Sequence, residues 1–529
     1  MALGYLALVL HAHLPYVRHP ETGYVLEEEW LFEAITETYV PLIRMFEGLE
    51  LDGIDFRLTM SMTPPLVAML EDPYLQDKYD QHLTLTRELV AQERERTKGN
   101  GHLQYLVSHY ETYFQQAYDT WHRYGRDLVR AFKYYQDRGN LDILTCGATH
   151  GYLPLMQMYP QAVWAQLKVA VDSYGLAFDQ APKGIWLAEC AYFPGLERMI
   201  ADVGLRYFIT DAHGILYAKP RPRYGPYAPI FSHSGVAVFG RDYESSQQVW
   251  SSEVGYPGDP AYREFYKDLG YEADYEYIKP YIIPNGTRKN TGIKYHRITS
   301  RTGALEGKEL YDPYWAREKA AAHASNFMEN RVRQVGYLNQ IMGREPIVLS
   351  PYDAELFGHW WYEGPWFLDY LIRKSTYDQQ TYRMTHLAEY LQLNPTQQVA
   401  TPAQSSWGAK GFHEYWLNDT NDWIYPHLHK AAERMIELSK REPQDEWEWR
   451  ALNQCARELL LAQSSDWAFI MRTATMVPYA IRRTRSHLLR FNRLYEALHK
   501  DNLDRTWLEK VEVLDNIFPE INYRVYRPL

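Results

Sequence analysis

Six short hydrophobic runs stand out along this chain, and polar side chains follow each of them. Each run is long enough for a buried strand but too short for a core helix, and stretches with helical periodicity separate the runs. Short apolar strands that alternate with helices are typical of a parallel α/β sheet or barrel. The six runs cover residues 5–10, 141–145, 184–187, 207–210, 236–239 and 347–349.

The polar residues that follow these runs predict one shared site. In a parallel barrel the carboxyl ends of the strands and the loops after them converge on one face, where functional groups gather. We therefore expect the side chains at these positions to line a common pocket. They are His11, His13, His150, Glu189, Asp211, His213, Arg241, Asp353 and Glu355.

The remaining segments predict how the chain is divided. Long helical patterns cover residues 111–136 and 313–340, between the strand-like runs. Residues 219–260 are rich in Pro, Gly, Tyr and Ser, and since they interrupt the strand series we expect an inserted lid over the pocket. Strand-like runs cease near residue 400. The predicted units are a barrel over 1–195 and 261–400, an inserted region over 196–260 and a helical domain over 401–529.

Charge and composition exclude several classes of partner. The chain has 56 Lys and Arg against 67 Asp and Glu, a net charge of −11, which disfavours nucleic acid. No run approaches the ~20 apolar residues of a membrane span, and the apolar start lacks the basic leader and cleavage site of a signal peptide. Three cysteines without CxxC spacing fit a reducing compartment. We expect a cytoplasmic protein without nucleic-acid or membrane partners; the oligomeric state is not predicted.

Aromatic residues make up 15% of the chain, including 45 Tyr and 16 Trp. A surplus of large rings either fills a large core or offers flat surfaces to sugar rings and other ligands. Two groups of tryptophans follow the pocket residues along the chain, so both a packed domain interface and a sugar-binding cleft are compatible with them. The two groups are Trp360, Trp361 and Trp366, and then Trp407, Trp416, Trp423 and Trp467.

One chemistry that the pocket residues suit is double displacement at a glycosidic bond. Glu189 stands alone after an apolar run, and Asp353 follows another. In a retaining reaction one carboxylate attacks the anomeric carbon while a second carboxyl group, about 5 to 5.5 Å away, protonates the leaving oxygen. Glu355 competes with Asp353 for the second role, and either residue could instead lie in the first turn of a helix.

A metal site is the second chemistry. His11, His13, His150, Asp211, His213 and Asp353 are ligand types that bind Zn²⁺, although the sequence has no HExxH motif and no paired CxxC motifs. Other catalytic signatures are missing. The sequence contains no GxSxG, no GxGxxG and no GxxxxGK[ST], which argues against a hydrolase elbow, a dinucleotide-binding motif and a P-loop.

Several longer motifs resemble glycoside hydrolase family 57, and within it most closely the 1,4-α-glucan branching enzymes. The resemblance covers essentially the whole chain, and the segment at 350–365 is its most specific part. HAHLP departs from the HQHQP form common in the family, which weakens an assignment to its amylases or 4-α-glucanotransferases. The motifs are HAHLP at 11–15, GATHGYLP at 147–154, GIWLAECAY at 184–192, SPYDAELFGHWWYEGP at 350–365, WGAKGFHEYWLN at 407–418 and AQSSDWAF at 462–469.

The resemblance implies an incomplete (β/α)7 barrel with an inserted loop and helical region and a C-terminal helical domain. It implies Glu189 as the nucleophile and Asp353 as the general acid/base, with no metal and no cofactor. In the mobile loop, Tyr243 is the tyrosine we expect to shield the intermediate. The substrate-binding residues expected from strand ends and resemblance together are His11, His13, His150, Asp211, Arg241, Tyr243, Trp360, Trp407, Trp416 and Asp466.

The expected function is retaining transfer: cleavage of an α-1,4 bond in an amylose- or glycogen-like glucan and formation of an α-1,6 branch. The alternatives are a 4-α-glucanotransferase or α-amylase of the same family, and a metal-dependent polysaccharide deacetylase or zinc glycosidase on a similar barrel. A glucan-binding protein without catalytic activity is a further alternative.

Overall fold

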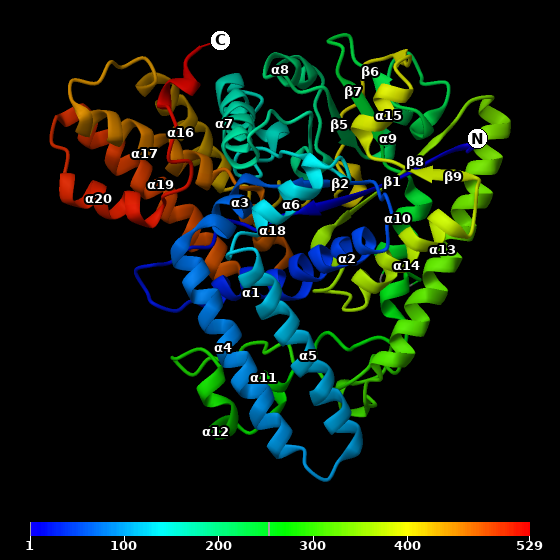
Figure 1. Ribbon diagram of the computed structural model, residues 1–529. Coiled ribbons are helices and arrows are strands. Elements are labelled where there is room, and N and C mark those ends of the chain that lie inside the picture. Colours follow the sequence, from blue (N-terminus) through cyan, green and yellow to red (C-terminus); the bar gives the residue numbers. More distant parts are fainter. Residues whose placement is uncertain (1, 252–253, 529) are drawn as a thin grey trace.

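The computed structural model describes residues 2–251 and 254–528, and a barrel of parallel strands lies at its centre (Figure 1). Its strands are short and almost wholly buried, which is why most of them read as apolar runs in the sequence. Within the described residues seven strands form the barrel: β1 (Gly4–Ala12), β2 (Leu58–Met62), β3 (Leu141–Leu144), β4 (Gly184–Ile185), β5 (Tyr207–Thr210), β7 (Ala237–Gly240) and β8 (Ile347–Asp353).

Two sheets join edge to edge to make this barrel. One has the order β3-β2-β1-β8 with β9 (Tyr382–Met384) also paired to β1, and the other contains β7-β5-β4. A parallel bridge between Thr145 and Ile185 connects β3 to β4. The backbone N–H of Asp242 donates to the carbonyl oxygen of Leu349 at 2.8 Å and connects the end of β7 to β8. The incomplete (β/α)7 barrel predicted above is therefore confirmed. Two short strands, β6 (Ile230–Phe231) and β10 (Gln398–Val399), extend the second sheet.

Strand β2 was not predicted from the sequence. Its residues, Leu58–Met62, mix Thr and Ser with Leu and Met, so they do not form an apolar run, yet all five are buried. β2 pairs in parallel with both β1 and β3 and occupies the place between them. Each of the six predicted runs overlaps a barrel strand, and β5 covers the residues predicted for it.

Helices surround the barrel, and one of the two predicted helical stretches is wrong in its bounds. The stretch at 313–340 forms α13 (Pro313–Met342), which begins after the capping residue Asp312. The stretch at 111–136 is instead two helices, α5 (Gly101–Arg123) and α6 (Leu128–Asp137). Gly125 has a φ of 65°, which ends the helical path, and Asp127 caps α6 by accepting the Arg130 N–H at 2.9 Å. The other helices packed around the barrel are α1 (Glu29–Ala34), α2 (Val40–Leu51), α3 (Pro64–Glu71), α7 (Pro160–Phe178), α8 (Leu196–Asp202), α9 (Ala212–Leu216), α14 (Gly364–Tyr377) and α15 (Leu387–Leu393).

A lobe that the sequence analysis did not predict projects below the barrel in Figure 1. It contains the long helices α4 (Pro73–Arg96) and α5, which pack side by side, with the short helices α11 (Leu269–Glu272) and α12 (Tyr275–Ile278) against them. Glu93 of α4 accepts hydrogen bonds from the hydroxyls of Tyr277 (2.6 Å) and Tyr295 (2.7 Å) and so ties the two parts of the lobe together.

The C-terminal part of the chain is helical, as predicted, and lies to the left of the barrel in Figure 1. Its helices are α16 (Ile424–Leu438), α17 (Glu446–Ala462), α18 (Ser465–Thr473), α19 (Val477–Lys500) and α20 (Arg505–Leu514). The predicted lid segment contains β6, β7 and α10 (Tyr243–Trp250), and its residues 252–253 lie outside the described residues. Since β5 and β7 belong to the sheet, residues 196–260 contribute to the barrel as well; the unit boundaries stay a prediction.

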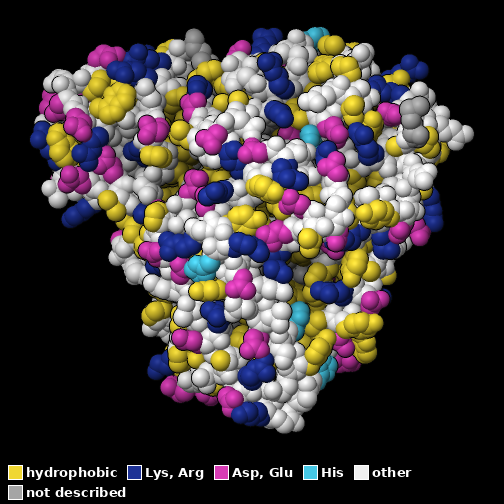
Figure 2. All heavy atoms as spheres, viewed as in Figure 1, with side chains coloured by type: hydrophobic (Ala, Val, Ile, Leu, Met, Phe, Trp, Pro, Cys, Tyr) yellow, Lys and Arg dark blue, Asp and Glu magenta, His cyan; other side chains and the backbone are white. Residues whose placement is uncertain are grey.

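The face of the molecule seen in Figure 2 carries mixed charge. Figure 2 shows acidic and basic side chains interspersed over the face in view, without one large patch of a single sign. None of the helices in the described part of the chain has the length and apolar character needed to cross a bilayer.

Candidate active site

The carboxyl ends of the barrel strands bring the predicted pocket residues together. His11 lies at the end of β1 and is the register partner of Asp353 at the end of β8. Glu189 follows β4 in the 3-10 turn Ala188–Cys190. His150 follows β3, and its ring lies over that of His13 with 3.8 Å between the centroids. The convergence expected from the strand ends is therefore present for these five residues.

Glu189 is held by residues of the C-terminal part of the chain. Trp407 Nε1–H donates to its Oε2 at 2.8 Å, and Ser465 Oγ lies 3.4 Å from its Oε1. The Trp407 backbone N–H also donates to the Glu189 carbonyl oxygen at 2.9 Å. Glu189 and Cys190 both have left-handed backbone conformations, with φ of 63° and 51°. Such strained positions persist where the surroundings fix them, and they cluster at active sites.

The pKa of Glu189 is raised to about 7. Burial is the main cause, and the negative charges of Asp353 and Asp466 act in the same direction. The hydrogen bond from Trp407 opposes them because it stabilises the carboxylate. Glu189 is therefore a half-buried carboxyl with two side-chain donors, Trp407 and Ser465, and it ionises near neutral pH.

Asp353 has a contrasting environment. Its carboxyl forms no hydrogen bond or ion pair with any other described residue. Burial, followed by the negative charge of Glu355, raises its pKa to about 7, while His13 and Arg241 act against this shift. A carboxyl group with a raised pKa and a nearby negative charge is suited to carry and donate a proton.

Glu355, the competitor of Asp353, is fixed in place by its own partners. Its Oε1 accepts the hydroxyl of Tyr39 at 2.5 Å and the backbone N–H of His13 at 3.2 Å. Its pKa is also raised to about 7, mainly by burial. Because its carboxylate is already engaged by two donors, Glu355 is less available than Asp353 for proton transfer to a ligand.

The three histidines form a stacked, hydrogen-bonded group beside the carboxyls. His11 Nε2 lies 3.1 Å from His150 Nε2, and its Nδ1 is hydrogen-bonded to Ser61 of β2. Burial, followed by the charge of neighbouring histidines, lowers the pKa of both His11 and His150 well below the usual value. These two rings are therefore neutral near pH 7 and can both donate and accept a hydrogen bond.

Asp466 completes this group from helix α18. Its two carboxylate oxygens lie 3.0 and 3.1 Å from His13 Nε2, and His13 Nδ1 is hydrogen-bonded to Thr63. Burial opposes the ionisation of Asp466, but the charge and hydrogen bond of His13 outweigh it and hold the pKa at about 2. Asp466 is therefore an anion across the physiological pH range.

The geometry of the histidines does not suit a shared metal ion. Donor atoms of His13, His150 and Asp466 do lie within 4.8 Å of one another. The His13 and His150 rings, however, are stacked with an interplanar angle of 17°. Imidazole lone pairs lie in the ring plane, so an ion about 2.0–2.1 Å from both nitrogens would have to sit out of both planes. His213 is bonded elsewhere, to Gly411 O at 2.9 Å, so the predicted ligands do not form one set.

Arg241 and Asp211 form one wall next to Trp407. Arg241 Nη1 lies 3.3 Å from Asp211 Oδ2, and its guanidinium carbon lies 5.8 Å from the centre of the Trp407 ring. Tyr243, the predicted loop tyrosine, begins helix α10 and is 64% exposed. No hydrogen bond or ring contact links Tyr243 to the other site residues in the described part of the chain. Its shielding role stays a prediction.

The predicted tryptophan platforms differ in their surroundings. Trp360 is 45% exposed, and its ring centre lies 6.2 Å from that of Trp250, so these two rings offer a surface to a ligand. Trp416 is only 1% exposed and stacks on Tyr152 at 4.4 Å. Its ring has no free face for a sugar. Instead it packs against Gly408, where a Cβ would lie 2.6 Å from the ring, and so supports the segment that carries Trp407.

Sequence reasoning missed several residues that orient the site. Ser61 and Thr63 belong to the unrecognised strand β2 and the residue after it, and Tyr39 carries no signal in the sequence. Ser465 and Trp186 lie inside quoted motifs, and Trp186 stacks on His11 with 4.7 Å between the ring centres. Trp250 lies at the end of α10, within the predicted lid.

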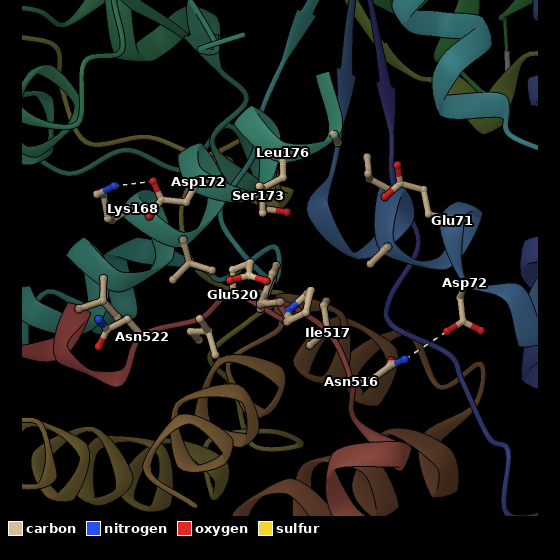
Figure 3. A pocket seen from close by; sticks show the side chains of 18 of the residues that line it. Glu71, Asp72, Lys168, Asp172, Ser173, Leu176, Asn516, Ile517, Glu520 and Asn522 are labelled. Atoms are coloured by element: carbon tan, nitrogen blue, oxygen red, sulfur yellow. Dashed lines mark hydrogen bonds and ion pairs between the residues drawn. The ribbon is translucent and has the colours of Figure 1, made fainter. Parts of the chain in front are cut away.

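A large cavity lies away from these residues. It measures about 750 Å³ and lies between α3, α7 and residues 516–525. Figure 3 shows its lining, including Asp72 and Asn516, which are joined by a hydrogen bond of 3.3 Å. None of the predicted site residues lines this cavity.

The family to which these residues belong is decided by comparison with known proteins. The profile of glycosyl hydrolase family 57 matches residues 7–402. The chain belongs to glycoside hydrolase family 57. The match contains all seven barrel strands except the first residues of β1, together with Glu189 and Asp353. A second profile, that of the C-terminal region of 1,4-alpha-glucan branching enzymes, matches residues 427–526.

Three known proteins are similar to this chain over nearly its whole length. A 1,4-alpha-glucan branching enzyme of Thermococcus kodakarensis is 35% identical over 97% of this chain and 77% of its own length. The crystal structure of a family 57 branching enzyme from Pyrococcus horikoshii has a TM-score of 0.89 and 33% identity, with 99% and 97% of the two chains covered. That of the α-amylase AmyC from Thermotoga maritima has a TM-score of 0.94 and 48% identity, with 99% of each chain covered.

Proposed function

We propose that this family 57 protein is a 1,4-α-glucan branching enzyme that uses Glu189 as nucleophile and Asp353 as general acid/base. The observation that carries the proposal is the contrast between two half-buried carboxyls on one barrel face: Glu189 accepts a hydrogen bond from Trp407, whereas Asp353 has no donor among the described residues and lies near Glu355. A hydrogen-bond donor stabilises the ionised form of a carboxyl group. A carboxyl group without a donor and near a negative charge is instead stabilised in its protonated form. The match of residues 427–526 to branching-enzyme C-termini supports branching in particular.

In the first step, Asp353 protonates the oxygen of an α-1,4 bond while the Glu189 carboxylate attacks the anomeric carbon. The bond between that carbon and the oxygen breaks, and the shortened glucan leaves with its 4-hydroxyl. The remaining glucan is held as a β-linked ester on Glu189. The ionised Asp353 that results is stabilised by His13 and Arg241.

In the second step, Asp353 acts as a base. It removes the proton from the 6-hydroxyl of an acceptor glucan as that oxygen attacks the anomeric carbon of the ester. The Glu189 carboxylate is released, and an α-1,6 bond replaces the α-1,4 bond. Two inversions leave the α configuration unchanged, as retaining chemistry requires.

The substrate-binding residues of the proposal surround this pair. His11, His13 and His150 would bind sugar hydroxyls: the neutral rings of His11 and His150 can both donate and accept, and Asp466 holds His13 in position. Arg241, Asp211 and Trp407 would bind the same glucan from the strand β5 and β7 side, and Trp360 would stack on a sugar ring. Tyr243 would cover the ester. Transfer prevails over hydrolysis when such contacts position the acceptor hydroxyl and exclude water.

Hydrolysis is the second candidate function. A specific observation favours it, because the α-amylase AmyC is 48% identical to this chain, whereas the branching enzymes compared here are 33–35% identical. The same two carboxyls serve both reactions, and only the fate of the ester differs. The distinction therefore depends on the acceptor side of the cleft.

One experiment separates the two functions. We would incubate the protein with amylose and count new α-1,6 linkages, after digestion with a debranching enzyme, against released reducing ends. The branching proposal predicts many new linkages per reducing end released. Reducing ends without new α-1,6 linkages would identify an α-amylase, and new α-1,4 chains without branches a 4-α-glucanotransferase. The Glu189→Gln variant is the control and should show none of these products.

The proposal includes a cytoplasmic location, where soluble α-1,4-glucan such as glycogen would be the partner. The state of the cysteines supports a reducing compartment, since Cys146, Cys190 and Cys455 are free and buried. Fractionation of the source cells would test the location.

A further inference from the structure

A second cavity, of about 380 Å³, lies between α2, α5, α13 and α14, outside the catalytic cleft. Three arginines from three different helices line it: Arg44 of α2, Arg317 of α13 and Arg373 of α14. None of the residues assigned to glucan binding or catalysis is part of its lining. The cavity therefore needs an explanation of its own.

The three arginines differ in their partners. Arg373 is neutralised, with Nε 2.9 Å from Asp369 Oδ1 and Nη1 2.6 Å from Asp52 Oδ2. Arg44 and Arg317 form no hydrogen bond or ion pair with any other residue in the described ranges. Arg317 only stacks on the ring of Trp366, with 4.6 Å between the guanidinium carbon and the ring centre. Two guanidinium groups at one cavity are thus left without an anion.

The surroundings of Arg44 make this unusual. Its side chain is half-buried, and burial lowers its pKa while the negative charge of Glu47 acts in the opposite direction. Glu47, however, is already engaged by Arg123 at 2.8 Å and by the Tyr124 hydroxyl at 2.9 Å. A guanidinium stays charged in a protein, and partial burial without a partner is unfavourable. A bound anion would remove this cost.

We propose that the cavity binds a phosphorylated small molecule through Arg44 and Arg317. The planar guanidinium fork matches phosphate oxygens with paired hydrogen bonds. The lining contains three arginines and Asp369 but no Glu or Lys, so its formal charge is +2. This charge balances a phosphate monoester, which carries roughly −1.5 to −2 at pH 7.

The rest of the lining suits a polar body attached to the phosphate. Thr112 and Gln116 of α5 and the uncharged ring of His109 offer donors and acceptors for hydroxyl groups, and Trp366 and Tyr113 add aromatic surface. Burial, followed by the charges of Arg263 and Arg317, lowers the pKa of His109 to about 4. The volume lies within the 300–1,000 Å³ usual for small-molecule sites. A hexose phosphate has the required size and chemistry.

Calorimetric titration with glucose 6-phosphate and with inorganic phosphate, at fixed ionic strength, tests the proposal. We expect saturable binding of one equivalent to the wild-type protein, and about tenfold weaker binding for each of Arg44→Gln and Arg317→Gln. Arg317 is exposed, so its variant should fold even if the Arg44 variant does not. Arg333→Gln, an exposed arginine on the same helix α13 but outside the cavity, is the matched control and should bind like the wild type.

Two results would overturn the proposal. One is the lack of saturable binding for both probes. The other is binding that persists in both arginine variants, or that the Arg333 control weakens equally, since either outcome would show that the cavity arginines are not the site. The proposal is independent of the glucan activity, because binding is measured directly and not through turnover.

Discussion

Trp407 donates a hydrogen bond of 2.8 Å from its indole N–H to Oε2 of Glu189, although 218 positions separate the two residues in the chain. Glu189 belongs to the barrel, and Trp407 belongs to the segment that leads to the C-terminal helices. The bond stabilises the carboxylate against burial and against the charge of Asp353. The C-terminal part of the chain thereby helps to set the ionisation of the proposed nucleophile.

Replacing Trp407 by Phe should raise the pKa of Glu189 further above about 7, because the donor that favours the anion is lost. Glu189 must be ionised to attack, so the acid limb of the kcat/KM profile should move to higher pH and activity at pH 6 should fall about tenfold. A pH–rate series on amylose measures this. Trp423→Phe, a tryptophan without contact to Glu189, should leave the limb in place; an unchanged limb in both variants would contradict the assigned bond.

Glu355→Gln should shift the alkaline limb of the kcat/KM profile. Removing the negative charge of Glu355 lowers the pKa of Asp353, which must be protonated for the first step. The alkaline limb should therefore shift to lower pH while substantial activity remains. Tyr39→Phe should have a smaller effect in the same direction. Loss of the Tyr39 hydrogen bond raises the pKa of Glu355 and so reduces the negative charge near Asp353. If Glu355→Gln instead abolished turnover at every pH, Glu355 and not Asp353 would be the acid.

Asp466→Asn should reduce stability at neutral pH. The folded-state pKa of Asp466, about 2, lies below the value of about 3.9 expected in the unfolded chain. The stabilisation is therefore complete above about pH 4 and is lost as the pH falls through 2, and it amounts to about 2.6 kcal/mol at most. Tm measured by calorimetry between pH 7 and pH 2 should show the variant destabilised at the upper end and converging with the wild type at the lower end. A constant difference in Tm would contradict the His13–Asp466 interaction.

Gly358→Ala should disrupt the loop that follows Asp353. Gly358 has a φ of 117°, and a Cβ there would lie 1.7 Å from the carbonyl oxygen of Glu37. We expect a loss of several kcal/mol of folding stability, or no folded protein. Gly336→Ala is the matched control, because the glycine lies within α13 with open space around it and alanine favours a helix by about 1 kcal/mol. Equal Tm values for the two variants would refute the close approach.

Much of the barrel was predictable because buried parallel strands appear as apolar runs, as for β5 and β1. Strand β2 was not predictable, because its Thr and Ser residues interrupt the apolar run although all five positions are buried. This mattered for the site, since Ser61 and Thr63 orient His11 and His13. The lobe of α4 and α5 was missed because its helices pack on distant segments, and no local pattern indicates that contact.

Site residues were predictable from the sequence where an ionisable side chain ends or directly follows a strand. His11, Glu189 and Asp353 each end or follow a barrel strand, so their convergence follows from the fold. The contacts of Trp407, Ser465 and Asp466 with that group depend on how the helical part docks, which spacing does not reveal. Trp416 was predicted to bind a sugar because it lies in a motif, but its ring is buried in the packing and has no face free for a ligand.

The most direct test of the proposed roles is to trap the ester. Asp353→Asn should react with α-maltotriosyl fluoride, whose leaving group needs no acid, and should then stall because no base activates an acceptor. Mass spectrometry of the intact protein and of its peptides should find one maltotriosyl group on the peptide that contains Glu189. A glycosyl group on any other residue, or prompt turnover without an adduct, would contradict the account.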